Sequence, residues 1–228
     1  MKTTRILGPA YITVFLPVML VLTANRLYAS VLWNESVNGS LSASGSSPTA
    51  LSLSDGVNAI LGTVGGSAQQ DWVALTVPTG FQLSSLVLAS YTSTDAQGFM
   101  GVQVGPSFTG SVNSASSWLG YTHFGTGAAN GSLPPTDLVG VDLLPIMGNN
   151  IVDSPGSQGF TPPLNAGTYT FLIQQLGANT AYEFDFGVTT VPEPSPAALV
   201  CLASGICITL AAVRRRRPAV KGRENIAA

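Results

Sequence analysis

Short runs of apolar residues alternate with turn-rich segments along the chain between residues 30 and 190. In residues 169–173 and 182–186, large side chains occupy every second position, which would place them on one face of a β-sheet. Residues 83–91 are most apolar in the middle of the run, as expected of a strand buried between two layers. About eight strands are predicted from this pattern, over residues 31–36, 57–64, 71–77, 83–91, 99–104, 118–124, 168–175 and 182–189.

Three connecting segments carry further structural information. Pro78-Thr79-Gly80 predicts a tight turn, since proline presets one backbone dihedral angle and glycine supplies a positive φ. The Ser- and Gly-rich residues 38–54 are expected to form either a loop or a weak edge strand. Residues 137–148 are largely apolar but contain a proline. They predict either a short helical turn that caps the mouth of a β-sandwich or an exposed binding loop, and we favour the cap.

Residues 30–190, called the body below, have the length and composition of one all-β domain. A chain of about 160 residues can bury a sizeable core, and no long amphipathic helical run is present. Strands at this spacing predict a jelly-roll-like β-sandwich. Both cysteines, Cys201 and Cys207, lie outside the body. The body is therefore expected to be stabilised by burial, without a disulfide or a thiolate metal site.

The N-terminal residues have the order of a secretory signal peptide. Lys2 and Arg5 precede the nearly all-apolar residues 6–24, and Ala29 is a small residue suited to the cleavage site. We predict a signal peptide over residues 1–29, with signal peptidase and the secretion machinery as partners. The alternative is an uncleaved signal anchor. A buried cytosolic helix is disfavoured because two prolines interrupt the apolar stretch.

A second apolar segment lies near the C-terminus. The 17 residues 197–213 carry no charge and are followed by four arginines, Arg214, Arg215, Arg216 and Arg217. As a helix they would reach roughly 25 Å, slightly short of a hydrocarbon core of ~30 Å. We predict a transmembrane helix over residues 197–213, preceded by a Pro-rich linker at 191–196 and followed by a basic cytoplasmic tail at 214–228.

The charge distribution agrees with export across a membrane. All nine Lys and Arg residues lie before Leu27 or after Val213, and the chain between them carries ten acids and neither Lys nor Arg. Positive charge beside an apolar segment stays in the cytoplasm, whereas an acidic or uncharged stretch is readily translocated. The body is therefore expected outside the inner membrane. Without a basic patch, it is not expected to bind nucleic acid.

The C-terminal segment 191–217 resembles the PEP-CTERM sorting signal of bacterial surface proteins. Pro192-Glu193-Pro194 matches the signature tripeptide, and the apolar segment and the arginine cluster follow it in the order of that family. The resemblance implies that an exosortase, a membrane-embedded cysteine protease, recognises the tail and cuts near the tripeptide. The tail would then be a substrate and not a catalyst. The alternative is an ordinary stop-transfer anchor after a proline-rich stalk.

The body resembles the bacterial pre-peptidase C-terminal domain, a β-sandwich module of secreted proteins. Residues 70–80 combine an acid, an aromatic residue, a short apolar run and a Pro-x-Gly turn, as at the start of the core of that family. Residues 166–174 contain a Gly-Thr-Tyr run that corresponds to its late strand. That domain usually accompanies a protease, whereas no protease domain is found here, so a targeting role does not follow from the resemblance.

Catalytic residues are sparse in the body. His123 is the single histidine, and no Gly-x-Ser-x-Gly motif accompanies it. Glycoside hydrolysis needs an acid and a base about 5 to 10 Å apart. Asp137 with Asp142 and Glu183 with Asp185 are the candidate pairs, but acids at alternate positions of a strand usually face solvent. We therefore predict no enzymatic activity and no catalytic residue.

Calcium is the metal ion that the body would suit best. Carboxylates in loops rich in Gly and Asn, which add carbonyl oxygens, are the ligands that hard cations prefer. No EF-hand spacing is present, so the sequence does not match this known type of calcium site. We predict no cofactor other than a calcium ion. The candidate ligands are Asp71, Asp137, Asp142 and Asp153.

The sequence favours one function and leaves two alternatives open. The favoured function is a non-enzymatic cell-surface or extracellular-matrix protein that is exported, anchored briefly by its tail and then cut. The first alternative is a carbohydrate- or matrix-binding module, with an exopolysaccharide as partner and exposed aromatic residues as the binding surface. The second is a secreted hydrolase, which is the least favoured because the body offers no convincing set of catalytic residues. The candidate aromatic residues are Trp33, Trp72, Trp118 and Tyr121, for each of which core packing is the default.

Overall fold

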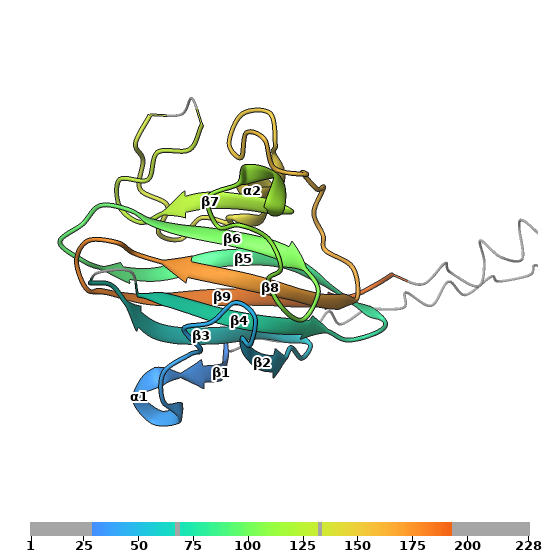
Figure 1. The fold of residues 1–228 in the computed structure, drawn as a ribbon. Helices are drawn as coiled ribbons and strands as arrows, with labels where there is room; N and C mark the ends of the chain where they lie inside the picture. Colours follow the sequence, from blue (N-terminus) through green and yellow to red (C-terminus); the bar gives the residue numbers. More distant parts are fainter. Residues whose placement is uncertain (1–28, 67–68, 132–133, 193–228) are drawn as a thin grey trace, which may run out of the picture.

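The computed structural model describes residues 29–66, 69–131 and 134–192, which form two β-sheets with few helical turns (Figure 1). The all-β, two-sheet character predicted from the sequence is confirmed. The elements are β1 (Ser30–Asn34), α1 (Glu35–Asn38), β2 (Thr49–Ser52), β3 (Gly56–Val64), β4 (Gln70–Val77), β5 (Phe81–Thr92), β6 (Gly98–Val104), the 3-10 helix η1 (Ala115–Ser117), β7 (Gly120–Phe124), α2 (Leu144–Gly148), β8 (Gly167–Gln174) and β9 (Thr180–Thr190).

The strands are divided between a four-stranded and a five-stranded sheet. Their orders are β1-β3-β9-β5 and β2-β4-β8-β6-β7. From β1 to β6, consecutive strands alternate between the two sheets, so each connection crosses the core. The edge pairs β1–β3 and β2–β4 are parallel, whereas the other pairs of named strands are antiparallel. These orders alone do not establish jelly-roll connectivity.

Each of the eight predicted strands corresponds to one observed strand, with corrections at two ends. The first ends at Asn34 because its Oδ1 accepts a hydrogen bond from Ser36 N at 3.0 Å, which caps the short helix α1. The strand predicted from Trp118 begins only at Gly120, since Trp118 follows η1 directly. Strand β2 has no counterpart among the eight predicted strands. It lies within residues 38–54, at the edge of the five-stranded sheet, so the edge strand and not the loop is the correct alternative for that segment.

The predicted turn at Pro78-Thr79-Gly80 joins the two sheets. Phe81 N donates to Pro78 O at 3.1 Å, and Gly80 has φ of 84°. A positive φ at this position is what a type II turn requires. The turn delivers the chain from β4 in the five-stranded sheet to β5 in the four-stranded sheet.

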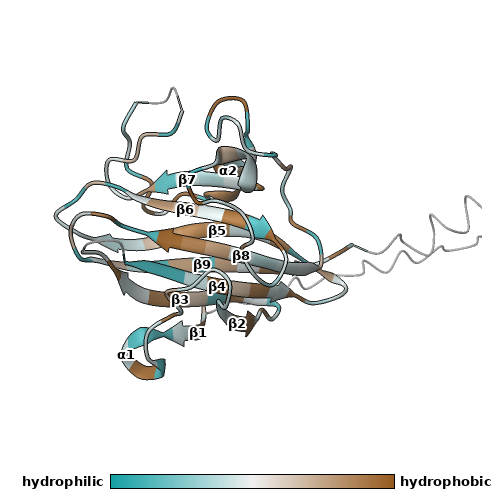
Figure 2. Cartoon of the chain, viewed as in Figure 1, coloured by the Kyte–Doolittle hydropathy of each residue, from teal (hydrophilic) through white to brown (hydrophobic). Residues whose placement is uncertain are grey.

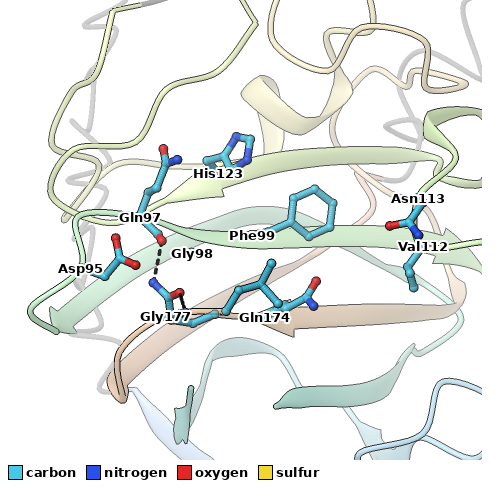
Figure 3. Close-up of a pocket in the computed structure, with 11 residues that line it drawn as sticks. Asp95, Gln97, Gly98, Phe99, Val112, Asn113, His123, Gln174 and Gly177 are labelled. Atoms are coloured by element: carbon cyan, nitrogen blue, oxygen red, sulfur yellow. Dashed lines mark hydrogen bonds between the residues drawn. The ribbon is translucent and has the colours of Figure 1, made fainter. Parts of the chain in front are cut away.

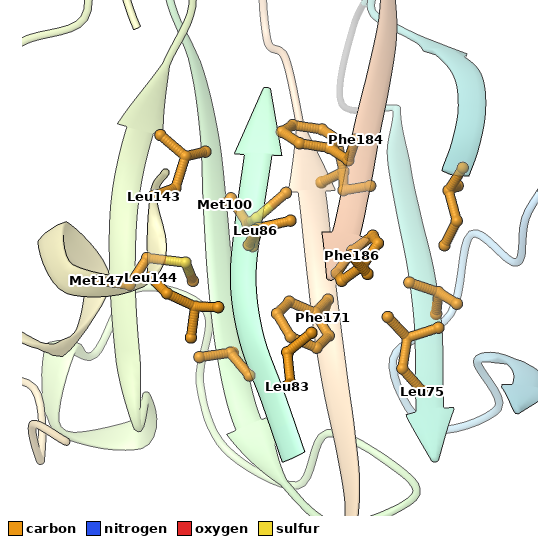
Figure 4. Close-up of a cluster of buried hydrophobic side chains, with 14 of the residues drawn as sticks. Leu75, Leu83, Leu86, Met100, Leu143, Leu144, Met147, Phe171, Phe184 and Phe186 are labelled. Atoms are coloured by element: carbon orange, nitrogen blue, oxygen red, sulfur yellow. The ribbon is translucent and has the colours of Figure 1, made fainter. Parts of the chain in front are cut away.

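The hydrophobic core lies between the sheets and is rich in aromatic residues. Phe171 of β8 packs edge-on against Phe186 of β9, with ring centroids 5.4 Å apart, so the contact joins the two sheets. Phe184 of β9 meets Phe124 of β7 in the same way at 5.0 Å. These four side chains are 0–1 % exposed. Figure 4 shows part of this cluster, and Figure 2 shows hydrophobic residues recurring along strands β5, β6 and β8.

Residues 137–148 close the side of the sandwich between β5 and β7. Leu143, Leu144 and Met147 are buried and belong to the main core. Leu143 N donates to Leu86 O at 2.7 Å, which pairs the segment with the edge of β5, and α2 packs against β7. The short helical turn of the capping alternative is therefore confirmed, but it covers the open side of the sandwich between the edge strands β5 and β7 and not the mouth. The segment also covers a sheet edge that would otherwise present unpaired backbone groups.

The expected ends of the chain fall largely outside the described residues. This applies to the signal peptide apart from Ala29, to the segment 197–213, and to Glu193, Pro194 and the arginines Arg214 to Arg217. Pro192 is the last described residue. Within the part of the chain that the structure describes, no helix combines the length and the apolar character needed to cross a membrane.

Candidate functional site

The outer face of the five-stranded sheet carries a second hydrophobic cluster. Trp72 of β4, Leu172 of β8, Phe108 and Trp118 form its buried part, here called the outer aromatic cluster. Trp118 stacks on Phe108 with ring centroids 4.4 Å apart and on Trp72 at 6.1 Å. The loop between β6 and β7 is thereby held flat against the sheet.

Gly101 of β6 makes this packing possible. A Cβ at this position would lie 2.7 Å from Cε3 of Trp118, closer than side-chain atoms are found. The indole therefore lies directly on the strand backbone. Gly101 is paired with Leu172 on one side and with Tyr121 on the other, so Trp118 covers the middle of the sheet.

A row of side chains crosses the same face next to the outer aromatic cluster. The strand register places Gln70 beside Gln174, Gln174 beside Phe99, and Phe99 beside His123. The ring of Phe99 lies 5.9 Å from Trp118, 5.8 Å from Tyr121 and 5.8 Å from His123, measured between centroids. Three aromatic neighbours therefore fix the orientation of Phe99.

A cavity of about 410 Å³ opens around Phe99 and is the candidate functional site. Figure 3 shows His123 and Gln174 on opposite sides of the ring, with Asp95 and Gln97 toward one end and Asn113 toward the other. These side chains come from β6, β7, β8 and two loops, which only the folded sheet brings together.

Hydrogen bonds hold the Asp95 end of the cavity in place. Gln175 is buried, and its Nε2 donates to Gln97 O at 2.7 Å while its Oε1 accepts from Gly177 N at 2.7 Å. Gln97 Oε1 accepts from Ala129 N at 3.0 Å. In contrast, Asp95, Asn113 and Gln174 form no side-chain hydrogen bond among the described residues. Their polar groups are available to a ligand.

His123 is an uncharged member of the site. Burial lowers the pKa of its imidazole below the ordinary value of 6.5, and the nearby Ala129 backbone and Asn130 side chain oppose this shift in part. Its Nδ1 is buried and has no hydrogen-bond partner within the described chain. The imidazole is therefore neutral at neutral pH.

The cavity lacks the residue pairs that the common hydrolytic mechanisms need. Its described lining contains one carboxylate, that of Asp95, and no Ser, Thr or Cys. A pair of carboxylates is therefore not formed there, and His123 has no nucleophile to activate. What the cavity offers is an aromatic ring surrounded by hydrogen-bonding groups, which suits binding.

The two candidate carboxylate pairs lie elsewhere. Glu183 and Asp185 are half-buried on the outer face of the four-stranded sheet, since the residues that alternate with them on β9 point into the core. Burial raises the pKa of Asp185 above its ordinary value. Asp137 Oδ1 accepts from Val139 N at 2.9 Å, and Asp142 Oδ1 accepts from Leu86 N at 2.9 Å. Asp142 thus serves as an acceptor for the β5 backbone.

The four aspartates predicted as calcium ligands are not brought together. Asp71 is buried between the sheets and accepts from Tyr182 Oη at 2.8 Å, while Asp153 Oδ2 accepts from Asn149 Nδ2 at 2.8 Å. Among the residues that the structure describes, no three His, Cys, Asp or Glu side chains are grouped so as to hold a metal ion. Calcium binding at any single one of these carboxylates stays a prediction.

The aromatic residues proposed as glycan contacts divide into two groups. Trp72 and Trp118 are 2 % and 1 % exposed, so the default of core packing is confirmed for both. Trp33 is exposed only in part, and its Nε1 donates to Gly39 O at 3.1 Å. Tyr121 is half-buried, and its hydroxyl donates to Pro155 O at 2.7 Å. The aromatic residue that lines the cavity is Phe99, which the sequence pattern identified only as part of a strand.

No protein-family model, no curated protein and no solved structure matches this chain.

Proposed function

We propose that this protein is an exported, non-enzymatic cell-surface or extracellular-matrix protein that is sorted and cut through its C-terminal tail. The observation that carries the proposal is the distribution of charge. Nine basic residues flank two apolar segments, and the 187 residues from Leu27 to Val213 contain none. Arginines beside an apolar segment keep that end of the chain in the cytoplasm, while the body between them is free to cross.

The build of the body supports the same proposal. Without Lys or Arg it forms no ion pairs with basic side chains, and without cysteine it forms no disulfide, so its stability is independent of the redox state of the compartment. Phe171, Phe184 and Phe186 supply burial instead. We propose jelly-roll-like connections for this sandwich, like those of the pre-peptidase C-terminal domain, because consecutive strands cross between its sheets from β1 to β6.

The last strand of the folded body ends two residues before Pro192, the first residue of the proposed sorting motif. β9 ends at Thr190, and Val191 N donates to Gly80 O at 2.9 Å, which ties the chain to the turn between β4 and β5. Pro192 and Glu193 follow directly in the sequence. A protease at the membrane surface would meet the motif immediately outside the sandwich, and cleavage there would release the body with its last strand intact.

The proposed partner is an exosortase-type membrane protease, with signal peptidase acting at the other end. Glu193→Ala removes the acid of the tripeptide, so the variant is expected to keep its C-terminal segment in cells that carry the sorting protease. Glu224→Ala, a matched change beyond the arginine cluster, should be cut like the wild type. Intact-mass measurement of both variants reads the outcome. Equal processing of Glu193→Ala and wild type contradicts the proposal.

A further inference from the structure

We propose that the cavity around Phe99 binds an uncharged sugar unit of a polysaccharide. This inference deepens the proposed function and rests on it in one respect: export would bring the protein to a polysaccharide outside the cell. The sugar would lay one apolar C–H face on the Phe99 ring and direct its hydroxyl groups toward Asp95, Asn113 and Gln174.

The aromatic platform is preorganised. Phe99 is the central residue of a row that runs from Gln174 to His123 across three neighbouring strands. Trp118 and Tyr121 pack against the ring from the outer aromatic cluster, so the ring does not need to reorient when a ligand arrives. A rigid aromatic side chain provides contact area at low cost in conformational entropy, which favours binding.

The polar groups around the platform match a polyhydroxylated ligand. The Asp95 carboxylate can accept two O–H donors, and the amides of Asn113 and Gln174 can each both donate and accept. These side chains lie on different sides of Phe99, as the hydroxyls around a sugar ring do (Figure 3). Unpaired in the described chain, they gain hydrogen bonds to a ligand without losing any to the protein.

The charge of the site selects against anions. Asp95 is the one acid in the described lining, no lining residue is Lys or Arg, and His123 is neutral because burial lowers the pKa of its imidazole. A uronate or phosphate group would face the carboxylate without a compensating cation. A cavity of about 410 Å³ also falls within the ~300–1,000 Å³ that small-molecule sites span. A neutral hexose or N-acetylhexosamine unit therefore fits best.

The test uses the purified full-length chain in a detergent without a sugar head group. It is applied to an array that carries oligomers of glucose, mannose, galactose and N-acetylglucosamine, with oligouronates as the anionic arm. We expect binding to at least one neutral class and none to the oligouronates. Gln174→Ala and Asp95→Asn should each weaken this binding about tenfold, the effect of losing one hydrogen bond to the ligand.

Two matched variants act as controls. Gln82→Ala and Asp55→Asn change the same residue types outside the cavity and should leave the affinity unchanged.

Phe99→Leu keeps an apolar side chain but removes the ring, so it should also weaken binding. No binding to any neutral sugar, a preference for oligouronates, or equal affinity of Gln174→Ala and Gln82→Ala would overturn the proposal. None of these results affects the processing of Glu193→Ala, so the two proposals fail separately.

Discussion

Asp71 makes the stability of the sandwich depend on pH. Asp71 is 3 % exposed and lies between the two sheets, where its carboxyl group accepts a hydrogen bond from Tyr182 Oη at 2.8 Å. Because the body contains no Lys or Arg, no cation is there to pair with it. Burial raises the pKa of Asp71 from 3.8 to about 7, the Tyr182 hydrogen bond lowers it in part, and nearby Glu35 raises it further.

The size and sign of the effect follow from this shift. The folded chain holds the Asp71 proton more tightly than the unfolded chain, so its contribution to stability is complete below a pH of about 4. It is lost as the pH rises to about 7, where the folded chain also releases the proton. A difference of about three pKa units corresponds to about 4 kcal/mol in the free energy of unfolding. Asp71 should therefore favour the folded state more at pH 4 than at pH 8.

Urea unfolding of wild type and Asp71→Asn between pH 4 and pH 8 measures this contribution. The neutral amide cannot titrate, so between pH 4 and pH 8 the free energy of unfolding of the wild type should fall by about 4 kcal/mol more than that of the variant. The free energy of unfolding of Asp71→Asn will also differ from that of the wild type by a further amount that does not depend on pH, because the new amide is buried. Asp55→Asn, at an exposed position, should keep the wild-type profile. Parallel pH profiles for wild type and Asp71→Asn would refute the reasoning.

Two further changes test the packing outside the main core. Gly101→Val would place a side chain within 3 Å of the Trp118 ring, so we expect a loss of about 1–3 kcal/mol and a red-shifted tryptophan emission. An unchanged emission spectrum would mean that the indole does not lie on β6. Asp142→Ala removes the acceptor of Leu86 N and Leu144 N and should cost about 1–3 kcal/mol in urea unfolding. Asp137→Ala, at an exposed loop position, should cost less, and equal losses would contradict the role given to Asp142.

The strands could be predicted because their residues carry the two-residue period of a sheet. In β9, Tyr182, Phe184 and Phe186 alternate with exposed or half-buried residues, and the same side chains fill the core. The sequence does not decide between loop and strand for β2, because Ser- and Gly-rich residues form a strand only where a neighbouring strand is available for pairing. Here that neighbour is β4, against which β2 lies parallel.

The cavity could not be predicted, because it depends on which strands are neighbours. Gln174, Phe99 and His123 lie far apart in the sequence and meet only through the registers of β8, β6 and β7. The one signal in the sequence was a polar residue at the end of a strand, at Gln174 and at His123, where an apolar residue would be expected on a buried face. Without strand order, that signal cannot be assigned to a common site.

The calcium prediction shows a related limit. Asp71, Asp142 and Asp153 are acids in turn-rich sequence, as calcium ligands are, but the fold uses each one locally. Backbone N–H groups and side-chain donors compete for the same carboxylate oxygens that a cation would need. Tertiary packing decides which donor each carboxylate meets, and the spacing of acids along the chain does not reveal that packing.

The intact mass of the protein recovered from its native cell envelope or medium tests the central claim most directly. Export and sorting predict a chain that begins near Ser30 and ends close to Pro192-Glu193-Pro194, well below the 23.4 kDa of the full chain. Recovery of the full-length mass, or of a mass that lacks only the N-terminal segment, would contradict removal of the tail by a sorting protease.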